Sequence, residues 1–126
     1  MDPENLRAVP LFASMAEEDL RRIATFASED SAPAGATLMR EGDFSNDMVA
    51  IEAGTADVIR GGETVGTLGP GDVFGETGVL GKQARNATIV ASSAMRLVRL
   101  ESWDVKRLPQ DVRDRMAELV ESRRAP

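Results

Sequence analysis

The sequence predicts a mainly β fold, a β-sandwich or β-roll, with helices before and after it. Turn residues recur every few positions from Ser31 to Gly81, and short apolar runs of strand length lie between them. Apolar residues return at helical spacing only near the two ends of the chain. Short strands joined by tight turns are typical of two-layered β domains. With 126 residues, the chain is long enough for one core and too short for two.

The first part of the chain, residues 4–28, is predicted to be helical. A short helix over residues 4–9 is closed by Pro10, and Ser14 then begins the pattern Ser14-Met15-Ala16-Glu17. In such a capping box, the serine hydroxyl and the glutamate carboxylate satisfy free backbone donors at a helix start. Leu20 and Ile23 follow at helical spacing, so we expect an amphipathic helix of about 13 residues.

Residues 29–101 are predicted to form the β region. Gly61-Gly62 lies between two apolar runs, a pattern typical of a β-hairpin. The last predicted strand carries Arg96 and Arg99 among apolar residues, so both arginines are expected to face outward. The predicted strands cover residues 37–39, 48–51, 56–59, 65–68, 87–91 and 95–100.

The last part, residues 102–123, is again predicted to be helical. Ser102 is a suitable N-cap. Pro109 has no N–H to donate within a helix, so we expect two helices rather than one. An apolar stripe follows at helical spacing and consists of Val105, Leu108, Val112, Met116, Leu119 and Val120.

The composition excludes several kinds of function. The chain has no cysteine and no histidine, which removes catalytic triads, cysteine nucleophiles, zinc fingers and two-histidine metal sites and leaves only carboxylate sites for Mg²⁺ or Ca²⁺. A formal charge of −6 argues against general nucleic-acid binding, which depends on Lys and Arg. The sequence shows neither a signal peptide at Met1 nor an apolar run of about 20 residues, so we expect a cytoplasmic protein without a membrane partner.

A candidate anion site lies within residues 74–87. Gly75 and Gly78 lack a Cβ, which allows backbone N–H groups to approach an anion. Arg85 can hold a phosphate through two parallel hydrogen bonds. Glu76 would repel a phosphate, so its expected target is a hydroxyl about one ribose away. These residue types fit a nucleotide with a single phosphate.

The run FGETGVLGKQARNA resembles the phosphate-binding cassette of the cyclic nucleotide-binding domain family. The matching positions are Phe74, Gly75, Glu76, Gly78, Val79, Leu80, Arg85 and Ala87. Further landmarks of the family occur in the usual order at Pro10-Leu11-Phe12, Arg40-Glu41-Gly42-Asp43, Ala53-Gly54 and Leu68-Gly69-Pro70-Gly71-Asp72. The resemblance covers nearly the whole chain. It implies a single domain over residues 1–126, a double-stranded β-helix (a jelly-roll-like β-roll) with flanking helices.

The resemblance also implies a function. The expected module is regulatory rather than enzymatic, needs no cofactor and binds cAMP, with cGMP as the alternative. Arg85 would hold the phosphate and Glu76 would accept a hydrogen bond from the ribose 2′-hydroxyl, and binding would draw in the helices after Ser102. Val65 and Leu68 resemble the base-contacting strand, although both also fit ordinary core positions. The expected ligand-binding residues are Phe74, Gly75, Glu76, Thr77, Gly78, Arg85, Asn86, Ala87, Val65 and Leu68.

Two positions depart from the family pattern and keep alternatives open. Thr77 stands where the family usually has an aliphatic residue, and Asn86 where it often has Ala, Ser or Thr. The choice between adenine and guanine therefore stays open. The alternative function is a ligand-free β-roll used as a structural or protein-interaction domain. A cupin-type enzyme is disfavoured, because cupin chemistry usually needs histidine ligands.

The output of the module is also open at this stage. Only Arg123-Arg124 and two further residues follow the last predicted helix, so no output domain is expected within the chain. We expect the module either to signal through a protein partner or to be part of a longer protein. A homodimer through the final helix is a further arrangement that the pattern permits.

Overall fold

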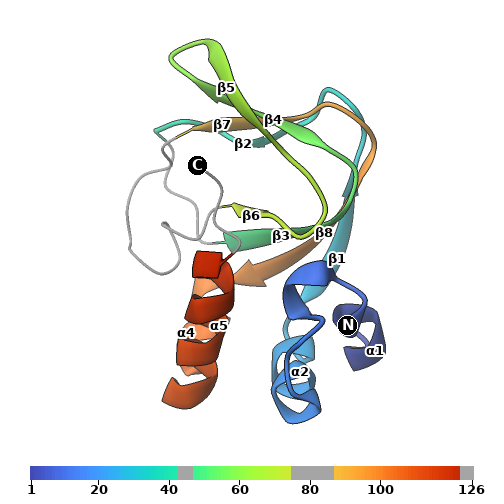
Figure 1. The fold of residues 1–126 in the computed structure, drawn as a ribbon, viewed down its shortest axis with the longest axis vertical. Coiled ribbons are helices and arrows are strands. Elements are labelled where there is room, and N and C mark those ends of the chain that lie inside the picture. Colours follow the sequence, from blue (N-terminus) through green and yellow to red (C-terminus); the bar gives the residue numbers. More distant parts are fainter. Residues whose placement is uncertain (43–46, 75–86, 123–126) are drawn as a thin grey trace.

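The fold is a β-roll, and the helices of the described residues lie on one side of it (Figure 1). In this computed structural model, residues 1–42, 47–74 and 87–122 are described. Within these residues, the strands form two four-stranded antiparallel sheets. The mainly β fold class predicted from the sequence is confirmed.

The first sheet has the order β1-β8-β3-β6, and the second has the order β2-β7-β4-β5. The strands of the first sheet are β1 Ser28–Ala32, β8 Met95–Glu101, β3 Asp47–Ala53 and β6 Val73–Phe74. Those of the second are β2 Thr37–Met39, β7 Thr88–Ala91, β4 Ala56–Arg60 and β5 Glu63–Leu68. The helices are α1 Pro3–Arg7, the 3-10 helix η1 Pro10–Phe12, α2 Glu17–Ala24, α4 Ser102–Arg107 and α5 Gln110–Ser122.

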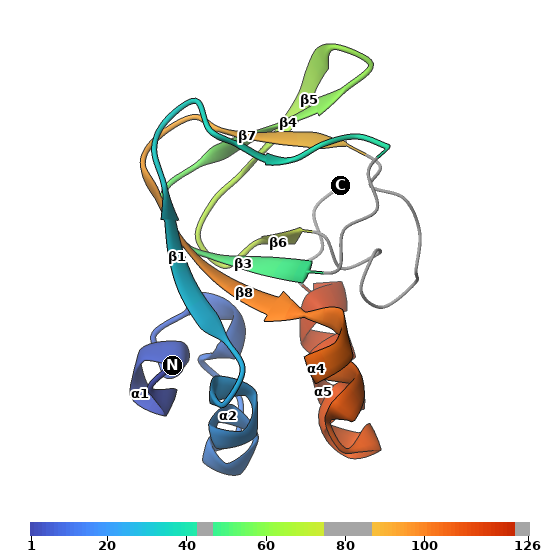
Figure 2. The ribbon, with the colours of Figure 1, turned by 180° about the vertical axis from the view of Figure 1, so that it is seen from behind.

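The helices lie on the face of the first sheet that points away from the second sheet, as both views show (Figures 1 and 2). The central strands β8 and β3 of the first sheet are therefore covered on both faces. One face of β8 places Val98 and Leu100 among the helices, in what we call the helical core. The other face places Met95 and Leu97 between the two sheets, in what we call the roll interior. Alternation along a central strand thus serves two separate cores.

The N-terminal helices differ from the sequence prediction. The helix that was expected to follow Ser14 begins only at Glu17, has eight residues rather than about 13, and is preceded by Ala16 as N-cap without a side-chain hydrogen bond. The predicted capping box is therefore wrong. The chain before it is taken up by η1 and by a turn in which Met15 N donates to Phe12 O over 3.1 Å. Three acidic residues, Glu17, Glu18 and Asp19, stabilise the positive end of α2 instead.

The C-terminal helices divide at Pro109, as predicted. Leu108 is extended, with ψ 149°, which is the conformation favoured before a proline. The predicted N-cap at Ser102 is wrong by one residue, because Glu101 holds the N-cap position and Ser102 is the first residue of α4.

The predicted strands occur at their expected places, whereas β1 and β6 were not predicted. β1 is exposed except at Ala32, so it lacks apolar alternation, and β6 has only two residues. The hairpin at Gly61-Gly62 is confirmed, with positive φ values of 58° and 82°. Arg96 is exposed as expected, but the side chain of Arg99 is only 29% exposed, so its outward orientation is not confirmed.

Candidate functional site

The expected site residues fall into two groups. Gly75, Glu76, Thr77, Gly78, Arg85 and Asn86 lie outside the described residues. Phe74, Ala87, Leu68 and Val65 lie within them, and their positions define what the fold contributes to the site.

Phe74 and Ala87 fix the two ends of the candidate segment on different sheets. Phe74 ends β6 and pairs with Val49 of β3 in the first sheet. Ala87 directly precedes β7 of the second sheet. Both side chains are buried, at 5% and 2% exposure, and both belong to the roll interior. The fold therefore holds the two residues that flank residues 75–86 against one shared apolar core.

A hydrogen-bonded turn positions the start of that segment. Gly69 N donates to Asp72 Oδ2 over 2.8 Å, and Asp72 N donates back to Gly69 O over 3.0 Å. The turn is also tied to β3, since Gly71 N donates to Ile51 O and Ile51 N donates to Asp72 O. Gly71 has φ 93°, a conformation that side-chain-bearing residues rarely adopt. This turn delivers the chain from the second sheet to β6 in the first.

Leu68 and Val65 occupy different environments. Leu68 is 3% exposed, pairs with Ala56 and belongs to the roll interior. Val65 is 51% exposed and is the large apolar residue found exposed within the described part of the chain. The register passes from Val58 and Gly66 to Ile59 and Thr64, which leaves Val65 without an opposite residue in a β-bulge of the edge strand β5. Leu68 thus lies with Phe74 and Ala87, and Val65 does not.

The arginine nearest in register to Phe74 is already paired. Val49, which pairs with Phe74, lies opposite Arg99 of β8. Arg99 Nε donates to Asp30 Oδ2 over 2.9 Å, and its Nη1 donates to Asp47 Oδ2 over 2.7 Å. The hydrogen bond from Arg99, followed by the backbone N–H of Ser31, lowers the pKa of Asp30 below its ordinary value. Two carboxylates neutralise this guanidinium, so it does not offer a free charge to a phosphate.

No local pattern in the sequence indicates this cluster, because Asp30, Asp47 and Arg99 come from three strands that are distant in the chain. Among the described residues, no group of three or more acidic side chains could hold a metal ion. In the same part of the chain, no helix is long and apolar enough to span a bilayer.

Comparison with known proteins connects this arrangement to a family. Residues 29–111 match the family model described as the cyclic nucleotide-binding domain. The chain is 33% identical over 104 residues to a cAMP-dependent protein kinase regulatory subunit of Schizosaccharomyces pombe, a match that covers 82% of this chain and 25% of that protein. The chain spans between 25% and 31% of the length of the first three curated relatives that it matches.

Solved structures share the fold. The regulatory domain of Toxoplasma gondii PKA, crystallised with cAMP, has a TM-score of 0.78 at 22% identity, with 95% of this chain and 48% of that chain covered. A cyclic nucleotide-binding domain from Methylobacillus flagellatus has a TM-score of 0.83 at 21% identity, with 96% and 79% covered. Both likenesses concern the fold, and they confirm the predicted double-stranded β-roll with flanking helices.

Proposed function

Because this chain belongs to the cyclic nucleotide-binding domain family, we propose that it is a regulatory module that binds cAMP, with cGMP as the second candidate ligand, and that it catalyses no reaction. The family match over residues 29–111 carries this proposal, since it includes the whole of residues 74–87. The relative in S. pombe is named for cAMP dependence, and the T. gondii domain was solved with cAMP. Both support cAMP over cGMP as the first candidate ligand.

Within this proposal, residues 75–86 bind the sugar and the phosphate. Arg85 holds the phosphate, Glu76 accepts a hydrogen bond from the ribose 2′-hydroxyl, and backbone amides near Gly75 and Gly78 complete the site together with Thr77 and Asn86. The positions of Phe74 and Ala87 support this role, because a segment whose two flanking residues are fixed in one core loses less conformational freedom on binding a ligand.

We further propose that binding is relayed to α4 and α5. The support comes from β6, whose two residues face different cores: Phe74 lies in the roll interior, and Val73, fully buried, lies in the helical core with Val105, Leu108 and Val112. A displacement that begins at residue 75 would move both. Since packed cores respond by switching between arrangements rather than by bending, such a displacement has a direct route to the helices.

The receiver of the signal is part of the proposal too. The chain spans about a quarter of the S. pombe relative, so either a protein partner or an adjoining part of a longer protein would receive the relay. A homodimer through α5 is the further arrangement to be tested by measuring the mass in solution.

Thermal unfolding with added nucleotide tests the proposal. At a ligand concentration 100 times Kd, binding stabilises a fold by about 2.7 kcal/mol, or about 8 to 16 °C for a domain of this size. We expect this shift with cAMP, a comparable or smaller one with cGMP, and little with linear AMP, which carries more negative charge and lacks the ring. No shift with either cyclic nucleotide would favour the alternative, a structural or protein-interaction domain.

Two substitutions assign the roles. Arg85→Ala should weaken cAMP binding by about 1.5 to 3 kcal/mol, or about 10- to 150-fold, and Lys82→Ala serves as the matched control within the same segment. Glu76→Gln should weaken binding less, because its amide oxygen still accepts the ribose proton. Calorimetric titration measures all three. A larger loss for Glu76→Gln than for Arg85→Ala would reverse the assigned roles.

A further inference from the structure

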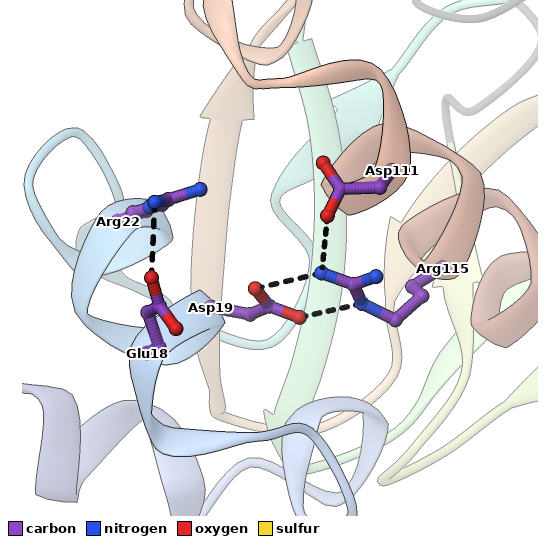
Figure 3. Close-up of polar contacts among 5 residues, drawn as sticks. All are labelled: Glu18, Asp19, Arg22, Asp111 and Arg115. Atoms are coloured by element: carbon purple, nitrogen blue, oxygen red, sulfur yellow. Dashed lines mark hydrogen bonds and ion pairs between the residues drawn. The ribbon is translucent and has the colours of Figure 1, made fainter.

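An ion pair joins α5, the last helix, to α2 (Figure 3). Arg115 of α5 donates from Nε to Asp19 Oδ2 over 2.6 Å and from Nη2 to Asp19 Oδ1 over 3.0 Å. Arg115 Nη2 also donates to Asp111 Oδ2, one turn earlier on α5, over 3.2 Å. The contact with Asp19 is bidentate, which is the strong and directional form of an arginine–carboxylate pair. We call the contact between Asp19 and Arg115 the clasp.

The carboxylate of the clasp is buried. The Asp19 side chain is 5% exposed, whereas that of Arg115 is 47% exposed. Among the described residues, Asp19 is the one charged residue that belongs to the buried class. A buried carboxylate without a cationic partner is costly, so the position of Arg115 is favoured as long as Asp19 remains ionised.

A neighbouring pair on α2 provides a contrast. Arg22 donates to Glu18 over 3.0 Å along the same helix, and the two side chains are 43% and 78% exposed. Such a pair stays within one helix and adds little stability. The clasp, in contrast, joins residues 96 positions apart and connects α2, which precedes the β-roll, with α5, which follows it.

α5 also contacts η1 and the helical core. Val112, in its first turn, is fully buried in the helical core. After Arg115, the described side chains of Ala117 and Glu118 are exposed. Figures 1 and 2 show α5 beside α2, on the side of the first sheet that points away from the second sheet. The clasp, the packing of Val112 and the contact with η1 therefore hold α5 in this arrangement.

We propose that the clasp is a latch that holds α5 against α2 and thereby lowers the affinity of the chain for cyclic nucleotide. This inference rests on the proposed function and deepens it. A ligand shifts a conformational equilibrium only by the difference between its affinities for the two states. If binding draws the C-terminal helices away from α2, part of the binding free energy separates Arg115 from Asp19. If the clasp is weaker, less binding free energy is used to separate the two side chains, and the measured affinity for the nucleotide is higher.

The variant Asp19→Asn tests the latch with little change of shape. It removes the buried charge and keeps one oxygen that can accept from Arg115. Arg115→Gln and the double variant complete a double-mutant cycle, in which the pair acts as one unit if the effects are not additive. The control is the double variant Glu17→Gln and Arg21→Gln, which removes another exposed pair within α2, one that does not include Arg22, a neighbour of Asp19. Unfolding curves establish that each variant is folded at the temperature of the titration.

We expect cAMP to bind Asp19→Asn more tightly by about 5- to 150-fold, the usual range for coupling between sites, while the control keeps the affinity of the parent. Unchanged or weaker binding by Asp19→Asn would overturn the latch.

A second measurement needs no nucleotide. The chain has no cysteine, so Arg21→Cys on α2 and Glu118→Cys on α5, both at exposed positions, provide unique sites for two spin labels. The latch predicts one narrow distance in the parent background and a longer or broader distribution when Asp19→Asn is added. Identical distributions would overturn the latch. Absence of cAMP and cGMP binding by the parent would instead overturn the proposed function, so the two failures are distinguishable.

Discussion

Replacing Gly54 by alanine should weaken the connection between the two sheets more than the same change at Gly35, Gly42, Gly61 or Gly62, which also have positive φ values. Gly54 joins β3 of the first sheet to β4 of the second and has φ +92°. A Cβ at this position would meet the carbonyl oxygen of Ala94 and would lie 2.8 Å from Met95 Cγ and 2.9 Å from Met95 Cα. Met95 begins β8, a central strand of the first sheet, so no rotation of a side chain relieves the contact with its backbone.

The magnitude follows from a comparison with Gly35. Gly35 has nearly the same backbone, φ +90°, but an added Cβ there would have no atom within 4 Å. Both substitutions cost about 1 to 2 kcal/mol for a side chain in the left-handed region. The backbone shift forced at Gly54 adds about 1 to 3 kcal/mol. We therefore expect a loss of about 2 to 5 kcal/mol for Gly54→Ala and about 1 to 2 kcal/mol for Gly35→Ala.

Urea unfolding followed by circular dichroism measures both losses. The comparison is valid where the two variants share the denaturant dependence of the parent, because a common slope means that the same surface is exposed on unfolding. Equal losses for the two variants would refute the reasoning, since the contact with Ala94 and Met95 would then contribute nothing.

Three further outcomes concern the packing of α5 and the ion pairs of the described residues. Val112→Ala should lower the free energy of unfolding by about 1.5 to 3 kcal/mol in urea, because it removes two methyl groups from a fully buried side chain, and an unchanged value would mean that α5 does not pack there. Glu18→Gln should change it by less than about 0.5 kcal/mol, as removal of an exposed pair within a helix does. Hydrogen bonds from Arg115 and Arg99 hold the pKa values of Asp19 and Asp30 below the ordinary 3.8, so the stability from these pairs is complete above that pH and is lost as the pH falls through the lowered values. Thermal unfolding between pH 7 and pH 2 checks this, and a loss that is already complete at pH 5 would contradict it.

Much of the fold could be predicted from the sequence because the relevant signals are local. Gly61 and Gly62 supply the positive φ values that a two-residue hairpin needs, whichever core the hairpin joins. Pro109 interrupts a helix through its own missing donor. In both cases, the residue itself carries the physical cause.

The elements that were missed depend on distant partners. β1 is held by its pairing with β8, 63 to 71 positions later, and its exposed side chains give no apolar pattern. The capping box predicted at Ser14 does not form, because the chain before α2 forms η1, whose position is fixed by Phe12 in the helical core. The clasp left one local signal: Asp19 lies on the same face of α2 as Ile23, so a charged residue interrupts an apolar stripe.

For the candidate site, the residue types predicted the class of ligand better than the sequence predicted where each side chain lies. The glycines and the two charged residues of residues 75–86 indicated a ligand class, and the family match supports it. The sequence left Leu68 and Val65 equivalent. Their difference follows from strand alternation, because residues three apart on a strand face opposite sides, and the β-bulge in β5 also leaves Val65 without an opposite residue on β4.

A nitrogen-15 NMR titration of the chain with cAMP tests whether the ligand binds next to Phe74 and Ala87, the two described residues that flank residues 75–86. We predict saturable shifts for the amides of Leu68, Phe74 and Ala87, extending through Val73 to Val112, with Asn5 of α1 unchanged. Amide signals that stay in place at millimolar cAMP, or shifts centred away from Phe74 and Ala87, would contradict the account.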